Sequence, residues 1–243
     1  MRALRILLIV VVILGGLFVI ADRVAVNYAE GEAADRVRTS EGLASTPDVS
    51  IKGFPFLTQA ASGTLDDVEI GIKDYDAKSG GESIRIADLN AEMHGVEFNS
   101  SFSSATAESA TGTARISYAE LLKAVRKQDA AQVAPGVTAQ IDGLSYGGGG
   151  DKVKVGITVH TALGTLHPTV LSSIKVTDGK VSARADSLPK VGALELAEGR
   201  IRAVTDFQQA IDDLPAGIEL DRVEAVKDGV EISVKGSKLD LVG

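Results

Sequence analysis

The chain has 243 residues, of which 44% are hydrophobic but only 4% aromatic, and its 33 acidic and 25 basic residues give a net charge of −8. Because it has no cysteine, it forms no disulfide, no thiolate metal site and no lipid-modified N-terminal cysteine. Lys and Arg are not clustered as a phosphate backbone would require, so we expect no nucleic-acid partner.

The N-terminus is basic at first and then strongly apolar. Residues 6–21, ILLIVVVILGGLFVIA, contain only apolar residues and glycine and follow Arg2 and Arg5. This run is slightly long for the core of a signal peptide and slightly short for a spanning helix, so a cleaved signal and an uncleaved anchor both stay open. The two arginines keep the start of the chain in the cytoplasm, so the rest is expected outside. We divide the chain into a signal or anchor segment (1–21), a helical juxtamembrane linker (22–44) and an exported domain (45–243).

Residues 51–59, IKGFPFLTQ, concentrate two of the six Phe around one proline. Phe54 precedes Pro55 and is therefore pushed towards extended backbone, and Pro55 has no N–H to give to a sheet. We predict a bend or strand edge here. The rings of Phe54 and Phe56 either plug the end of the core or line the rim of a binding trough.

Downstream, apolar and polar residues mostly alternate, as in strands with one apolar face. The longest alternating run covers 153–161 and includes Val155 and Ile157. Asp-Gly pairs at 178–179 and 228–229 predict hairpin turns. Shorter alternating runs occupy 68–72, 84–93, 174–176, 181–183 and 230–234. The pattern predicts long antiparallel sheets.

Two segments have helical periodicity instead. In the first, Ser117 and Glu120 form a capping box, and an apolar stripe follows at Tyr118, Leu121, Leu122 and Val125. The second has Thr205 or Asp206 as cap and ends at Pro215. Its stripe consists of Phe207, Ala210, Ile211 and Leu214. Similar strands and glycine steps flank both segments, which predicts an internal duplication of a helix-plus-sheet unit.

These elements predict an α+β fold that is mostly antiparallel β with two or three helices. The strands offer more apolar surface than two short helices cover, and bulky side chains to fill the difference are scarce. Either two sheets close on each other as a sandwich, which is the commoner arrangement, or a curved sheet leaves an apolar trough. In a trough, a lipid tail gains about 0.8 kcal/mol for each buried CH₂.

No motif carries a convincing catalytic or metal site. Ser145 in GLSYG matches a nucleophile-elbow pattern, but a glycine-rich turn and another strand follow it where a helix is required. The DYD at 74–76 has the spacing of a metal-nucleotide carboxylate pair but fits a solvated turn better. His160 and His167 have no second ligand at a suitable spacing. We therefore predict a protein without catalytic residues, cofactor or metal.

Two segments resemble the LmeA family of exported phospholipid-binding proteins. They are VSIKGFPFLTQAASGTLDDVEI, residues 49–70, and LPAGIELDRVEAVKDGVEISVKGSKLDL, residues 214–241. The resemblance covers about residues 45–241, and GFPFLTQ is its most specific part. It implies an elongated fold like that of tubular lipid-binding domains, with an apolar groove, and a role in building envelope lipids or lipoglycans by lipid handling.

We therefore expect an extracytoplasmic protein that holds or shuttles phospholipid acyl chains and contacts the cytoplasmic membrane through its N-terminal segment. The alternative is a non-catalytic envelope scaffold with a packed sandwich core and a protein partner. The expected lipid-binding residues are Phe54, Phe56, Leu57, Tyr118, Leu122, Val125, Val155, Ile157, Phe207, Ile211 and Leu214.

Overall fold

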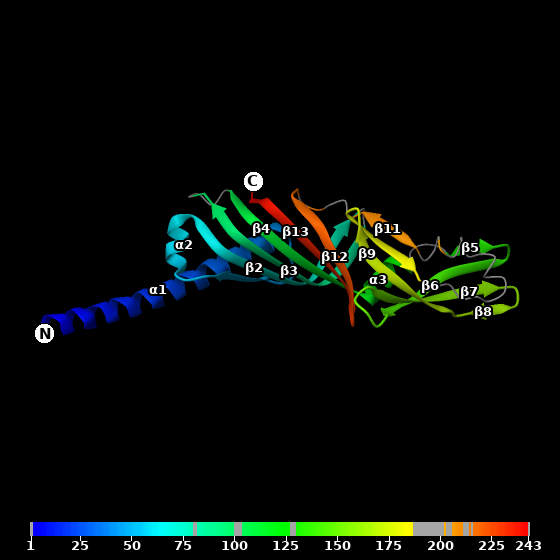
Figure 1. Cartoon of the computed structure of the whole chain (residues 1–243), viewed down its shortest axis with the longest axis horizontal. Helices are drawn as coiled ribbons and strands as arrows, with labels where there is room; N and C mark the ends of the chain where they lie inside the picture. Colours follow the sequence, from blue (N-terminus) through cyan, green and yellow to red (C-terminus); the bar gives the residue numbers. More distant parts are fainter. Residues whose placement is uncertain are drawn as a thin grey trace. The chain divides into compact units, whose positions relative to one another are not determined.

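The fold is α+β, as predicted, and its described part contains three helices and thirteen strands (Figure 1). The computed structural model describes residues 2–79, 82–99, 104–126, 130–186, 202, 206–210, 214 and 216–242. The helices are α1 (Arg2–Ser40), α2 (Phe56–Ser62) and α3 (Tyr118–Arg126). The strands are β1 (Asp48–Lys52), β2 (Thr64–Ser79), β3 (Glu82–Phe98), β4 (Ala105–Ser117), β5 (Ala131–Ala134), β6 (Val137–Tyr146), β7 (Lys152–Thr161), β8 (Gly164–Leu166), β9 (Thr169–Thr177), β10 (Lys180–Ala185), β11 (Phe207–Ala210), β12 (Ile218–Val226) and β13 (Gly229–Val242).

The strands form two sheets. One has the order β1-β2-β3-β4-β13-β12, and the other has the order β11-β10-β9-β7-β6-β5 with β8 paired to β7. The β6–β7, β7–β9 and β9–β10 pairs are all antiparallel. Neighbours in space are mostly neighbours in sequence, which suits short hairpin connections and the alternating pattern of the chain.

The chain divides into two compact units. The first contains Met1–Ile72, Asn90–Thr111 and Gly236–Gly243, and the second contains Lys73–Leu89 and Gly112–Lys235. The long strands β2, β3, β4 and β13 contribute residues to both units. The boundary predicted at residues 21 and 22 falls inside α1, which continues without a break to Ser40.

In the first unit, the C-terminal half of α1 contacts β1 and α2. The residues of α1 that face the unit lie four apart, which is close to one helical turn. Val26 and Ala34 are buried on this stripe, together with Val49 of β1 and Met93 of β3. The helical linker predicted for residues 22–44 is thus a packed part of the unit as far as Ser40.

In the second unit, the strict alternation of β7 produces one buried face. Val153, Val155, Ile157 and Val159 are all 6% exposed or less, whereas Lys154 on the other face is exposed. Helix α3 packs over β6, and β12 contacts β9 and β7. The predicted strand 153–161 and the predicted helix at 117 are confirmed in type and in approximate position.

The helix predicted at 205–214 is wrong where the structure describes the segment. Residues Phe207–Ala210 form β11, which pairs antiparallel with Lys180–Ala183 of β10. Two turns of helical spacing are weak evidence, and pairing with the edge of β10 overrides them. Asp206, one of the two predicted caps, instead accepts a hydrogen bond from the Ala185 N–H at 2.9 Å. The duplication hypothesis therefore loses one of its two helices.

The two predicted hairpins form, but through different turns. In the β9–β10 hairpin, Asp178 and Gly179 have φ values of 51° and 69°, as a tight primed turn requires. In the β12–β13 hairpin, the turn residues are Lys227 and Asp228, and Gly229 already begins β13. A Cβ at Gly229 would overlap the Ile116 carbonyl of β4, so close strand approach requires this glycine.

Residues 74–76, where a turn was also expected, belong to a strand instead. Strand β2 continues to Ser79, and Asp74 has a φ of 51° within it. Asp76 pairs with Arg85 of β3 at 3.0 Å. Asp76, one of the two acids considered as a metal-nucleotide pair, therefore belongs to a cross-strand ion pair.

Candidate functional site

The segment between β1 and α2 contains the two closely spaced phenylalanines, and the structure separates their environments. Gly53 has a φ of 90°, the Phe54–Pro55 peptide bond is cis, and Phe56 begins α2. The Phe56 side chain is 8% exposed and the Phe54 side chain is 58% exposed. Of the two rings, Phe56 plugs the core and Phe54 faces outwards. The predicted bend is confirmed, but α2 after it was not predicted.

Gln59 braces this bend from inside. Its Nε2 donates to the Lys52 carbonyl at 3.3 Å, and its Oε1 accepts from the Asp66 N–H at 2.8 Å. A Cβ at Gly53 would overlap the Gln59 amide and would lie 2.7 Å from Asp66 Oδ2. The side-chain amide of Gln59 therefore occupies the space that only a glycine at position 53 leaves open.

The same bend is attached to α1 through Asp22, the first residue after the apolar run. The Asp22 side chain is buried, and its Oδ1 accepts the Leu57 N–H at 2.8 Å. Its Oδ2 pairs with Arg23 at 2.7 Å, and the Arg23 guanidinium lies 5.3 Å from the centroid of the Phe54 ring. The sequence analysis treated Asp22 only as a boundary. The sequence signal that could have identified this contact was a single carboxylate directly after the apolar run.

A second carboxylate of α1 repeats this link two turns further on. Glu30 Oε1 accepts the Ile51 N–H of β1 at 2.8 Å. Together with the buried Val26 and Ala34, the two acids form a stripe at every fourth residue of α1. The stripe alternates backbone-binding carboxylates with apolar contacts. We call residues 22–34 of α1 and residues 51–59 together the anchor clamp.

The other group of predicted residues lies in the second unit and forms one apolar cluster. Tyr118, Val155 and Ile157 are buried in it, and Leu122 and Val125 pack against it while keeping part of their surface in solvent. The apolar stripe of α3 therefore packs against the same cluster as the buried residues of β6 and β7. We call the partly buried apolar residues that pack against this cluster its margin. The described margin includes Leu121, Leu122, Val125, Val137, Leu144, Val176, Val181 and Ile232.

Local interactions hold α3 on this cluster. The Ser117 hydroxyl accepts the Glu120 N–H at 3.2 Å, which is the predicted N-terminal cap. The Tyr118 hydroxyl donates to the Val226 carbonyl of β12 at 2.9 Å. Burial raises the pKa of Tyr118, so this phenol stays protonated and keeps its role as donor.

The remaining predicted lipid-binding residues are only partly described. The backbone of Phe207 belongs to β11 at the edge of the seven-stranded sheet. Leu214 is half-buried. Ile211 lies outside the described residues. The helical stripe predicted for 207–214 is therefore not formed at 207–210, where the backbone is a strand.

The serine in GLSYG is not a nucleophile elbow. Ser145 is an exposed residue of β6, paired with Lys154 of β7, and a turn leads from β6 to β7. His160 lies six residues further along β7, at about 3.3 Å per residue and thus about 20 Å away. Its Nδ1 lies 3.0 Å from the Thr165 hydroxyl.

A second serine has neighbours that resemble a catalytic set. Lys152 Nζ lies 2.6 Å from the Ser173 hydroxyl and 2.9 Å from Asp186 Oδ2, and Ser173 also donates to Asp186. The hydrogen bond to Asp186 raises the pKa of Lys152, so its ammonium cannot accept the serine proton. Hydrogen bonds from Ser173 and Lys152 lower the pKa of Asp186, which makes it a weak base. This group is a polar link between β7, β9 and the end of β10.

One set of potential metal ligands was not singled out from the sequence. Asp67 of β2 and Glu92 and His94 of β3 bring their ligand atoms within 4.8 Å of one another. His94 Nδ1 lies 2.5 Å from Asp67 Oδ1, and His94 Nε2 lies 3.7 Å from Glu92. An imidazole between two carboxylates accounts for this arrangement without an ion, and all three side chains are at least one-third exposed.

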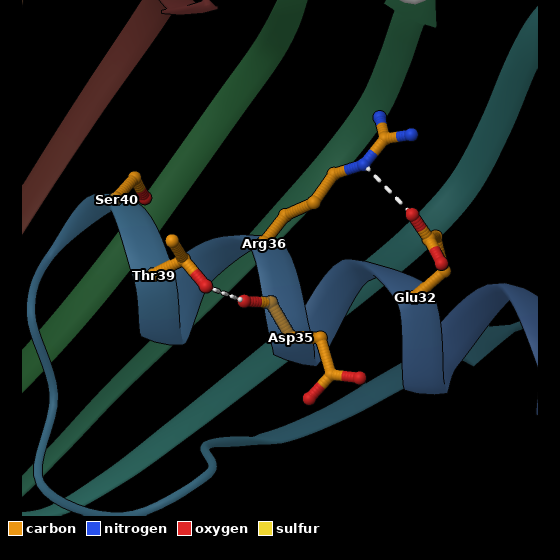
Figure 2. Close-up of a pocket in the computed structure, with 5 residues that line it drawn as sticks. All are labelled: Glu32, Asp35, Arg36, Thr39 and Ser40. Carbon is orange, nitrogen blue, oxygen red and sulfur yellow. Dashed lines mark hydrogen bonds and ion pairs between the residues drawn. The ribbon is translucent and has the colours of Figure 1, made fainter.

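The last turns of α1 border an open depression lined by Glu32, Asp35, Arg36, Thr39 and Ser40 (Figure 2). Figure 2 shows Arg36 extending along the helix to Glu32, whereas the Asp35 carboxylate points away from both. The Arg36 Nε to Glu32 Oε1 distance is 3.2 Å. Because its one cation is already paired with an acid and a second acid stands beside it, this depression is poorly suited to an anionic headgroup.

Comparison with known proteins decides the family. A family model for LmeA-like phospholipid-binding proteins matches residues 20–235. The chain belongs to the LmeA-like phospholipid-binding family. No curated protein and no solved structure matches it.

The LmeA-like match includes both groups of residues described above. It begins at residue 20, so it covers Asp22 and Arg23 and leaves out nearly all of the apolar run. That run forms the first half of α1, which is long and apolar enough to cross a membrane and therefore suits a signal peptide or an anchor. Membership of an LmeA-like family supports phospholipid binding, and it favours a binding role over an enzymatic one.

Proposed function

We propose that this protein binds phospholipid by its acyl chains outside the cytoplasmic membrane and passes lipid on during envelope lipid or lipoglycan assembly. The observation that carries this proposal is the apolar cluster of the second unit. Its margin includes eight described apolar side chains that keep part of their surface in solvent. An acyl chain laid along this margin would remove that surface from water.

The acidic chain favours recognition of tails over headgroups. The net charge is −8, and many of the described cations are already paired with acids, as Arg115 is with Asp88 and Lys235 with Asp221. A broad basic surface is the usual means of attracting anionic headgroups. Affinity for lipid would therefore come mainly from the acyl chains.

A buried hydroxyl in the second unit is a candidate ligand contact that can be tested directly. Ser172 of β9 is 1% exposed, and its Oγ has no hydrogen-bond partner among the described residues. It lies in the sheet next to Val153, on the same side as the buried Val170 and Ile174. An orphaned buried hydroxyl costs about 1–3 kcal/mol, and a lipid ester oxygen would supply the missing acceptor.

Lipid binding is tested first on the full chain. Gentle extraction followed by native mass spectrometry should show co-purified phospholipid. Chain that is free of lipid, together with no uptake of a fluorescent phosphatidylcholine, would contradict the proposal. A stable protein complex in the same preparation would then favour a scaffold with a packed core.

Two substitutions on α3 locate the contact. Leu122→Asn should weaken uptake of the fluorescent lipid about tenfold or more, since a buried Leu contributes about 1.5–3 kcal/mol. Ala119→Asn, at an exposed position of the same helix, is the matched control and should bind as the unmodified chain does. Equal binding by both variants at equal melting temperature would remove α3 from the lipid site.

Ser172→Ala separates a ligand contact from a mere packing defect. The lipid-free chain should melt at a higher temperature because the orphaned hydroxyl is gone, while lipid affinity should fall several-fold because an acceptor loses its donor. A higher melting temperature with unchanged lipid affinity would show that Ser172 does not touch the lipid. Transfer of labelled phospholipid from donor to acceptor vesicles measures the shuttling part of the proposal.

A further inference from the structure

The apolar half of α1 ends where the folded part of the first unit begins. The large apolar residues from Leu4 to Ile20 are 43–68% exposed, and none of the apolar window of α1 is buried. At 1.5 Å per residue, the segment 4–21 is about 27 Å long, close to the thickness of the hydrocarbon layer. Asp22, the next residue, is the first buried one. With α1 in a membrane, Asp22 therefore marks the boundary between hydrocarbon and headgroups.

The anchor clamp fixes the bend at this same level. The Leu57 N–H binds Asp22 directly, and the Phe54 ring lies 5.3 Å from the guanidinium of Arg23. The second link, from Glu30 to Ile51, prevents rotation about the first. Phe54 is thus held at the height of the membrane boundary by contacts to the spanning helix itself.

Phe54 has the properties of an interfacial residue. The chain has only six Phe, and the side chain of this one is 58% exposed. Its contacted cation, Arg23, is about half exposed and sits directly after the apolar run. An aromatic ring next to a basic residue at the end of a spanning helix suits the headgroup layer, where apolar and polar surroundings meet.

We propose that Phe54 contacts the membrane surface, with its ring in the headgroup layer of the leaflet next to Asp22. The clamp then holds the first unit at a fixed height and orientation on the bilayer, instead of leaving it on a free tether. This membrane contact is separate from the proposed acyl-chain binding in the second unit. It requires α1 to remain attached but no lipid in the apolar cluster.

The chain has no tryptophan, so one introduced tryptophan reports on its own surroundings. In the full chain reconstituted in vesicles of phosphatidylcholine and phosphatidylglycerol (3:1), the fluorescence of Phe54→Trp should be blue-shifted. Phosphatidylcholine brominated at carbons 6 and 7 should quench it roughly twofold, and lipid brominated at carbons 11 and 12 should quench it less. Tyr28→Trp is the matched control: Tyr28 is 75% exposed on α1. It lies six residues beyond Asp22, about 9 Å further along the helix, and should emit as in water without quenching.

Three results would overturn the proposal. Emission from Phe54→Trp like that of the Tyr28 variant would place the ring in water. A blue shift without quenching would place it against protein. Equal quenching by both brominated lipids would place it along an acyl chain withdrawn from the bilayer. Leu122→Asn is read in the lipid-uptake assay, so failure of the membrane contact and failure of lipid binding remain distinguishable.

Discussion

The anchor clamp and the apolar cluster of the second unit both bury apolar side chains, but they do so by different means. In the clamp, nearly every residue has a specific partner: Gly53 leaves room for Gln59, Leu57 donates to Asp22, and Ile51 donates to Glu30. In the cluster, apolar side chains from α3 and from strands of both sheets pack against one another, and among them only Tyr118 is described with a side-chain hydrogen bond. A clamp of this kind fails at single positions, whereas a cluster loses stability in proportion to the apolar surface removed.

The largest contrast is expected between the two phenylalanines of the bend. Phe56→Ala removes a ring that is 8% exposed and should lower the free energy of unfolding by about 4 kcal/mol. Phe54→Ala removes a ring that is 58% exposed and should cost about 0.5 kcal/mol or less. Thermal and denaturant unfolding of the full chain in detergent, followed by circular dichroism, measures both. Equal losses would mean that Phe54 also belongs to the core.

A smaller effect is expected where backbone shape alone is changed. Gly53→Ala should lower the free energy of unfolding by about 2–3 kcal/mol, because φ is positive and the new methyl group overlaps the Gln59 amide. Gly42→Ala is the control, since Gly42 also has a positive φ, 61°, but no atom of the described residues lies within 4 Å of its added Cβ. The difference between the two losses measures the overlap of the new methyl group with the Gln59 and Asp66 side chains. Identical losses would show that the Gln59 and Asp66 side chains both move aside freely.

In the apolar cluster, the loss in free energy of unfolding should depend on how deeply the removed group is buried. Ile157→Val removes one methylene from a side chain that is 2% exposed and should cost about 1 kcal/mol. Val181→Ala, at the partly exposed margin, should cost less when lipid is absent. Unfolding in denaturant under the same conditions tests this order. A loss at Ile157 as large as that at Phe56 would show that the cluster is as specific as the clamp.

The cluster was predictable from sequence, and the clamp mostly was not. Strict alternation placed Val155 and Ile157 on one face, and the Ser117–Glu120 spacing marked the start of α3, because each signal lies within one element. The link between Asp22 and Leu57 joins residues 35 apart, and no local pattern reports it. The four residues of β11 were misread for the same reason, since a sheet edge distant in sequence determined their state. Phe54, Phe56 and Leu57 were recognised as unusual, but their different environments follow only from the packing of α1.

The smallest effect concerns the polar link of the second unit, and its pH dependence separates it from packing. Hydrogen bonds from Ser173 and Lys152 lower the pKa of Asp186 in the folded chain. Its contribution to stability is therefore complete above the unfolded value of about 3.9 and is lost as pH falls through the lower folded value. The pKa of Lys152 is raised by Asp186, so the contribution of this lysine is complete below its unfolded value of about 10.4 and is lost as pH rises through the folded one.

Asp186→Asn should accordingly lower the melting temperature by about 2 °C or less near pH 7, since both side chains are about one-third exposed. The difference from the unmodified chain should shrink as the pH falls through the lowered folded pKa of Asp186. The exposed Asp240, changed to Asn, is the control and should leave the melting temperature unchanged throughout. A difference for Asp186→Asn that stays constant as the pH falls would arise from lost packing and not from the charge of Asp186.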